Sequence, residues 1–99
     1  MIAVVWEFVV KQESIGDFRR IYGPDGDWAV LFRRYPGFEG TTLLQDEATA
    51  TRFLTIDRWK DSGDFRRMKD ESRQEYARLD EQCGALTVSE REIGVFEEG

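Results

Sequence analysis

The sequence predicts an α+β fold of the ferredoxin-like βαββαβ type, in which an antiparallel sheet carries its helices on one face. Four runs rich in β-branched and aromatic residues have the length and composition of strands. Apolar residues at helical spacing lie between the first and second runs and again between the third and fourth. A chain of 99 residues has room for one hydrophobic core, so we expect a single domain over residues 1–99.

The strand-like runs end at polar or turn-forming residues, which sets their expected bounds. They are Ile2–Val10, Gly40–Asp46, Thr51–Trp59 and Val88–Phe96. Only four residues separate the second run from the third, so these two should pair as an antiparallel hairpin. Alternation along the last run predicts Ile93 and Val95 on one face and Val88 and Phe96 on the other.

The helical segments are recognised by apolar side chains that recur every three or four residues. The first segment carries Ile15, Phe18 and Tyr22 and ends at Gly23 and Pro24. A second short segment runs from Trp28 to Tyr35. A long stripe from Phe65 to Leu86 predicts one helix capped by Asp61 or Ser62, with Gly84 as a candidate earlier end.

Charge and composition exclude several classes of function. Lys and Arg number 14 and Asp and Glu number 20, a formal net charge of −6, so nucleic acid and anionic membranes are not expected partners. The chain has no histidine and only one cysteine, Cys83, which we interpret as a small buried side chain. No metal-ligand set, disulfide or nucleotide-binding glycine motif is visible, and we expect no cofactor. Without a signal peptide or a run of about 20 apolar residues, we expect a cytoplasmic protein that does not enter a membrane.

Both faces of the predicted sheet are apolar. On the first strand, Trp6 and Phe8 point to one face, while Val5 and Val9 point to the other. Helices can cover only one of these faces, and the other would leave an apolar patch larger than the roughly 300–600 Å² that monomers usually expose. We therefore expect a homodimer in which a second copy covers this face.

Segments of the chain also resemble a known family, the antibiotic biosynthesis monooxygenase (ABM) domains. The resemblance lies in Val4–Phe8, Tyr22–Ala29, Gly40–Asp46 and Phe53–Trp59 together with the Phe65 that follows them. It implies the dimeric α+β barrel of that family. One branch resembles oxygenases that oxidise aromatic polyketides without metal or flavin, because the substrate itself forms a carbanion that reduces dioxygen.

Another branch of the family degrades haem with an Asn on the first strand, a Trp at the end of the third and a His on the last helix. Trp59 matches that Trp, but the chain contains neither Asn nor His, so haem degradation is not expected. The quinone-forming oxygenases of the family also use an Asn beside Trp, Tyr and Arg residues, and here the Asn is missing.

The candidate catalytic residues are Trp59, Tyr76, Asp57 and Arg58. Trp59 would form a wall of the site through the family match. A tyrosine such as Tyr76 could donate a proton to an oxygen intermediate, Arg58 could stabilise a developing oxyanion, and a buried Asp57 could act as a base. The competing interpretation is that the arginine is a surface or dimer-contact charge and that Asp57 pairs with an arginine in the sheet.

The candidate substrate-binding residues are large side chains expected between the sheet and the helices. They are Trp6, Trp28, Phe32, Tyr35, Phe65 and Met68. Together they would form an apolar cleft with a few polar tips, as small-molecule sites generally have. The competing interpretation is that these side chains are core residues, since stripes at helical spacing most often are.

Two hypotheses of function follow. The first is a cofactor-independent monooxygenase that acts on a small aromatic or quinol-like substrate in the apolar cleft. The alternative is a non-catalytic homodimeric module that binds an apolar metabolite, or a dimer whose clefts are filled by side chains. The missing Asn and His favour the alternative, and the family resemblance favours the enzyme.

Overall fold

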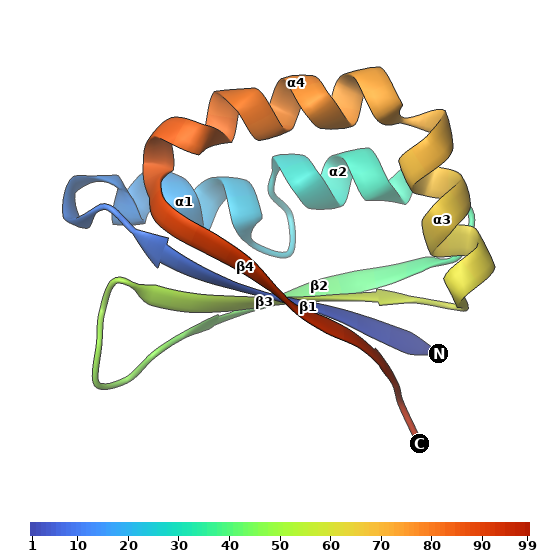
Figure 1. The fold of residues 1–99 in the computed structure, drawn as a ribbon, viewed down its shortest axis with the longest axis horizontal. Helices are drawn as coiled ribbons and strands as arrows, with labels where there is room; N and C mark the ends of the chain where they lie inside the picture. The colour runs from blue at the N-terminus through green and yellow to red at the C-terminus, as the bar shows by residue number, and fades with distance from the viewer.

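The computed structural model describes residues 1–99, and its elements follow the predicted βαββαβ order (Figure 1). The strands are β1 (Ile2–Val10), β2 (Phe38–Gln45), β3 (Arg52–Trp59) and β4 (Thr87–Glu97). The helices are α1 (Ile15–Tyr22), α2 (Asp27–Arg33), α3 (Ser62–Glu71) and α4 (Arg73–Cys83). Two short 3₁₀ turns, η1 (Gln12–Ser14) and η2 (Gly84–Leu86), precede α1 and β4.

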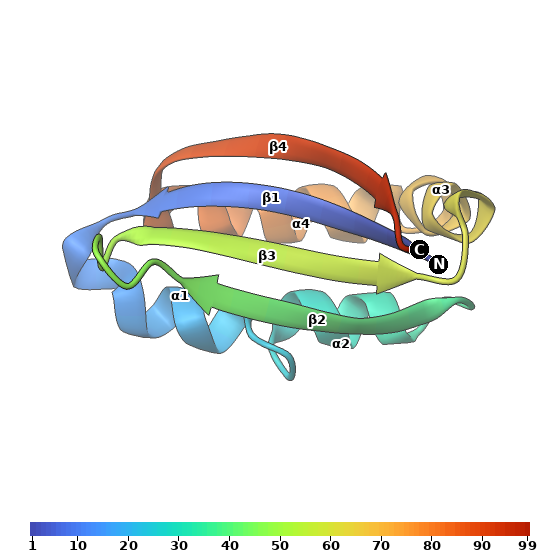
Figure 2. The ribbon, with the colours of Figure 1, turned by 90° about the horizontal axis from the view of Figure 1, so that it is seen from below.

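The four strands form one antiparallel sheet in the order β2-β3-β1-β4. β2 and β3 form the predicted hairpin, and β1 lies between β3 and β4. All helices lie on one side of the sheet (Figure 1). The view from below shows the strands in front of the helices, so the other face of the sheet is uncovered (Figure 2). The predicted ferredoxin-like α+β fold is confirmed.

The core lies between the covered face of the sheet and the helices. Period-two alternation places Val4 and Phe8 of β1 and Phe53 and Trp59 of β3 on this face, and all four are buried. Phe18 of α1 packs over them, with its ring centroid 5.0 Å from that of Phe53. These side chains belong to one aromatic-rich cluster that holds α1 and α2 against the sheet.

The long helix predicted after β3 is two helices. Ser72 separates α3 from α4 with a backbone near φ −94° and ψ 9°, and Figure 1 shows the chain changing direction there. Ser72 is 1% exposed, and its hydroxyl donates to the sulfur of Met68 at 3.4 Å. The stripe continues across the bend because α3 packs at the end of β3 while α4 runs along the covered face of the sheet, so both helices bury an apolar face (Figure 2).

β4 departs from the strict alternation that its sequence predicts. Val5 pairs with Gly94 but Trp6 pairs with Glu92, so Ile93 is an extra residue in a β-bulge. Val95 faces the helix side of the sheet beside Val4. Ile93 has no partner on β1 and does not share that face with Val95 in regular alternation. A second register shift occurs where Val9 and Val10 meet the beginning of β4.

The uncovered face of the sheet combines apolar and charged side chains. Leu44 and Phe96 are 45% and 49% exposed there, and Leu54 and Ile56 are half-buried. The carboxylate of Glu7 accepts hydrogen bonds from arginines of both neighbouring strands, Arg52 Nε at 2.8 Å and Arg91 at 3.0 Å. These ion pairs hold the pKa of Glu7 below its usual value.

None of the helices has the length and apolar composition needed to span a membrane.

Candidate functional site

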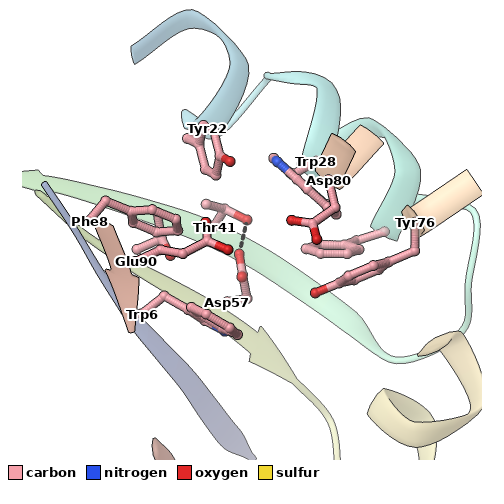
Figure 3. Close-up of a pocket in the computed structure, with 11 residues that line it drawn as sticks. Trp6, Phe8, Tyr22, Trp28, Thr41, Asp57, Tyr76, Asp80 and Glu90 are labelled. Carbon is pink, nitrogen blue, oxygen red and sulfur yellow. Dashed lines mark hydrogen bonds between the residues drawn. The ribbon is translucent and has the colours of Figure 1, made fainter. Parts of the chain in front are cut away.

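A pocket opens between the covered face of the sheet and the helices (Figure 3). Its cavity volume is about 50 Å³, or about 460 Å³ when the space at its mouth is included. The eleven lining residues come from all four strands and from α1, α2 and α4: Trp6, Phe8, Tyr22, Trp28, Phe32, Thr41, Thr55, Asp57, Tyr76, Asp80 and Glu90. Six of these residues are aromatic and the other five are polar, so the pocket combines apolar walls with groups that can bind polar atoms, as small-molecule sites do.

Asp57 brings a carboxylate to the inside of this pocket. It lies on β3 on the same face as Trp59, and the register places it opposite Val4 on one side and Thr41 on the other. The hydroxyl of Thr41 donates to Asp57 Oδ1 at 2.6 Å (Figure 3). Burial raises the pKa of Asp57 to about 6, although the Thr41 hydrogen bond opposes that rise. A carboxyl with such a pKa can accept and release a proton near neutral pH.

Tyr76 points into the same pocket from α4 (Figure 3). Burial and the negative charges of nearby acidic residues, Asp80 first among them, raise the pKa of Tyr76 to about 12. Its hydroxyl therefore stays protonated at neutral pH and can donate a hydrogen bond or a proton. The ring packs edge-to-face on Trp28, with centroids 4.8 Å apart.

Trp28 and Tyr22 bring two further polar groups to the pocket. Figure 3 shows the indole nitrogen of Trp28 and the hydroxyl of Tyr22 turned toward one another. Trp28 is 8% exposed, and its buried Nε1–H has no hydrogen-bond partner. Burial, together with the thiol of Cys83, raises the pKa of Tyr22 above its usual range. A buried N–H donor without a partner costs free energy, and the group on its hydrogen-bonding side is the Tyr22 hydroxyl, not the open part of the pocket.

Two more carboxylates line the pocket near its mouth. Asp80 comes from α4, one turn after Tyr76, and Glu90 comes from β4. Figure 3 shows the side chains of Asp57, Asp80 and Glu90 directed into the same hollow. Burial and the neighbouring charge of Asp80 raise the pKa of Glu90. No Lys or Arg is among the lining residues.

The structure brings half of the sequence-predicted site residues to this pocket. Asp57 and Tyr76 of the predicted catalytic group line it, and so do Trp6, Trp28 and Phe32 of the predicted substrate-binding group. Their roles in a reaction stay predictions, since position alone does not show activity.

The other predicted residues lie elsewhere. Trp59 is fully buried behind the pocket, with its ring 5.1 Å from that of Phe38 and 5.6 Å from that of Phe32. Tyr35 and Phe65 pack at the edge of the core, and Met68 is fully buried in it.

Arg58 belongs to the uncovered face of the sheet. Its guanidinium donates to Glu98 Oε1 at 2.9 Å and to the hydroxyl of Thr42 at 3.0 Å. Nothing in the structure brings Arg58 to the pocket, so the oxyanion role proposed for it has no geometric support there.

Sequence reasoning did not assign four polar lining residues to the site: Thr41, Thr55, Asp80 and Glu90. Asp80 could have been found, because it is four residues after Tyr76 on the same helix face. Thr41 could have been found only with the hairpin register, which places it opposite Asp57. Glu90 gave no such signal, since the position of β4 beside β1 sets where it points.

Solved structures of other proteins share this fold. A structure of a variant of SnoaB, a cofactor-independent oxygenase from Streptomyces nogalater, matches with a TM-score of 0.80 at 24% identity, covering 98% of this chain and 91% of that one. A protein from Deinococcus radiodurans that carries the name of the antibiotic biosynthesis monooxygenases matches with a TM-score of 0.79 at 14% identity, covering 100% and 93%. A protein of the same name from Bordetella bronchiseptica matches with a TM-score of 0.75 at 16% identity, covering 99% and 96%. At these identities the likeness establishes the fold.

A search of curated proteins gave no significant match. The family model described as antibiotic biosynthesis monooxygenase matches residues 1–78, which include β1 to β3 and most of the pocket-lining residues. With this match over most of the sequence and the same fold in the solved structures, the chain belongs to the antibiotic biosynthesis monooxygenase (ABM) family.

Proposed function

We propose that the protein is a cofactor-independent monooxygenase that oxidises a small aromatic or quinol-like substrate in the pocket of Figure 3. The observation that carries this proposal is Asp57, a carboxylate inside an aromatic pocket with a pKa raised to about 6. Family membership and the fold shared with SnoaB support the same class of reaction.

In this proposal Asp57 removes a proton from the substrate, and the electron pair left on the substrate reduces dioxygen. A carbon–oxygen bond forms and gives a hydroperoxide. Loss of a second proton from the same carbon breaks the oxygen–oxygen bond, so one oxygen atom remains as a carbonyl and the other leaves as water. In the same proposal the neutral hydroxyl of Tyr76, which lines the pocket, donates a hydrogen bond to the peroxide.

Oxygen uptake with a panel of anthrones and hydroquinones tests this function. We expect the wild-type protein to consume oxygen at a rate that rises with pH through about 6, where Asp57 loses its proton. Asp57→Asn should lower that rate by about 100-fold or more, the usual contribution of a general base. Glu81→Gln is the matched control, because Glu81 is exposed on α4 and does not line the pocket.

Two results would contradict the proposal: no oxygen uptake with any member of the panel, or an Asp57→Asn rate equal to that of the wild type. The second result would remove Asp57 from the mechanism even if oxygen is consumed.

A non-catalytic module that binds an apolar metabolite is the second candidate. The position of Arg58 on the opposite face favours it, since no cationic side chain lines the pocket to stabilise an oxyanion. Native mass spectrometry of the freshly purified protein separates the two functions. A retained small molecule that the protein does not oxidise in air would identify the binding module.

A further inference from the structure

The lining of the pocket has one sign of charge. Asp57, Asp80 and Glu90 contribute three carboxylates, and none of the eleven lining residues is a Lys or Arg. Lys69 places a cation 5.1 Å from the ring centroid of Tyr76, but Lys69 does not line the pocket. A cleft with low-dielectric walls and charges of one sign concentrates ligands of the opposite sign.

The aromatic walls favour a positive charge for a second reason. Trp6, Trp28 and Tyr76 surround the hollow into which the carboxylates point (Figure 3). The face of an aromatic ring carries negative potential, and tryptophan and tyrosine rings attract ammonium groups most effectively when water is excluded. Aromatic walls and carboxylates therefore select for the same kind of ligand group.

The charges of the pocket also limit the other polar groups of the ligand. A carboxylate on the ligand would be repelled by the three carboxylates of the pocket. A neutral phenol or quinol hydroxyl avoids that repulsion and can donate a hydrogen bond to one of them.

We propose that the ligand of this pocket is an aromatic amine in its cationic form, a phenol or quinol whose side-chain ammonium group lies between Asp80 and Glu90. This inference rests on the proposed function in one respect, since it takes the ligand to be the aromatic substrate of the same pocket. The ring lies against Trp6 and Tyr76, and a ring hydroxyl is directed at Asp57. Asp57 is left free to take a proton from a ring hydroxyl.

Binding of three phenols that differ only at the end of the side chain tests the charge preference. Tyramine ends in an ammonium group, p-propylphenol in a methyl group and p-hydroxyphenylpropionate in a carboxylate. Isothermal titration calorimetry under nitrogen measures binding alone, because no oxygen is present for turnover. We expect tyramine to bind about ten-fold more tightly than p-propylphenol, with the carboxylate weakest of the three.

Variants assign the preference to the two carboxylates near the mouth of the pocket. Asp80→Asn and Glu90→Gln should each lower the affinity for tyramine by about five-fold and leave the affinity for p-propylphenol within about two-fold of wild type. Glu81→Gln, next to Asp80 on α4 and outside the pocket, should leave both affinities unchanged. Raising the salt concentration should weaken tyramine binding and not p-propylphenol binding.

Three results would overturn the proposal: p-hydroxyphenylpropionate binding as tightly as tyramine, no measurable binding of tyramine at millimolar concentration, or an unchanged preference for tyramine in the Asp80→Asn/Glu90→Gln double variant. The oxygenase proposal fails separately. Tyramine binding with no oxygen uptake from any quinol would leave the charge preference standing and remove the enzyme.

Discussion

Two effects act in opposite directions on the ionisation of a single residue, Asp57. Burial among aromatic rings disfavours its charged form, and the hydrogen bond from Thr41 favours that form. The balance raises the pKa to about 6, which suits a base but costs stability whenever the carboxyl is ionised.

The stability of the wild-type protein relative to Asp57→Asn should therefore fall as pH rises. Well below pH 3.8 the carboxyl is protonated in both the folded and the unfolded state, so it costs nothing. Between its usual pKa of 3.8 and its folded value of about 6, the unfolded chain releases the proton more readily, and the folded state loses relative stability. Above about pH 6 the cost is complete, at most roughly 3 kcal/mol.

Urea unfolding of both proteins at pH 4 and pH 7.5 measures this difference, because the contributions of the other carboxylates cancel between them. An Asp57→Asn protein that gains nothing over wild type at the higher pH would contradict the raised pKa.

Trp59 is a second residue whose substitution should change the stability of the protein. Its side chain is fully buried among Phe32, Phe38 and Phe65, while its Nε1–H has no hydrogen-bond partner. Trp59→Ala should lower the free energy of unfolding by about 3–5 kcal/mol through the cavity that it leaves. Trp59→Phe keeps most of the apolar contact and removes the unpaired donor, so it should cost less than half as much. Equal losses for both variants, measured by urea unfolding, would contradict a core role.

Among the secondary-structure elements, the pairing of the start of β2 with the end of β3 depends on Gly37, the residue just before β2. The backbone of Gly37 has φ +92°, and its carbonyl accepts a hydrogen bond from the Lys60 N–H at 2.7 Å. A Cβ built on Gly37 would lie 2.6 Å from the Cβ of Asp64 and still closer to its carboxylate. A side chain at this position would strain the backbone and collide with the first turn of α3.

Gly37→Ala should accordingly destabilise the protein by about 1–3 kcal/mol. Gly16→Ala is the matched control, since Gly16 lies in α1 with no atom within 4 Å of a built Cβ. Alanine is the better helix former, so this variant should gain about 0.5–1 kcal/mol. Thermal unfolding of the two variants should therefore move the midpoints in opposite directions, and two shifts of the same sign would count against the strain at Gly37.

The interruption of the helix at Ser72 is a feature that apolar spacing along the sequence does not predict. Apolar spacing continues from α3 into α4, and the Tyr76 N–H still donates to the carbonyl of Ser72. The direction of the chain changes because α3 packs at the end of β3, whereas α4 runs back along the covered face of the sheet in the direction of the strands (Figures 1 and 2). After the bend, α4 brings Tyr76 and Asp80 to the pocket.

For the whole molecule, the uncovered face of the sheet leads us to expect a homodimer. Leu44, Leu54, Ile56 and Phe96 form an apolar surface around the ion pairs of Glu7. We expect a second copy of the chain to cover this surface with its own sheet, in an isologous contact.

Sedimentation equilibrium at micromolar concentration should therefore show a homodimer. Ile56→Lys places a charge at the centre of the uncovered face and should shift the equilibrium to monomer, because an unpaired charge would be buried in the contact. Val30→Lys is the control: Val30 is 54% exposed on α2, on the helix side of the sheet, and its replacement should leave the dimer intact. A monomeric wild type, or a dimer unaffected by Ile56→Lys, would contradict the face-to-face arrangement.

Local periodicity was enough to predict most of the fold. Alternation in β1 and β3 identified the faces of the sheet, and the glycine–proline pair after Tyr22 marked the end of α1. The bulge at Ile93 and the bend at Ser72 could not be predicted, because each depends on the partner against which the segment packs.

The sequence by itself determined the order of the elements, which strand residues share a face, and the carboxylate and aromatic side chains available for a site. Only the tertiary structure decided that Asp57, Asp80 and Glu90 meet in one pocket, that Trp59 is core and that Arg58 lies on the opposite face. The physical reason is the distance along the chain over which each effect acts. Backbone periodicity acts over neighbouring residues, whereas a pocket depends on strand register and on where each helix crosses the sheet, which are set by packing between distant parts of the chain.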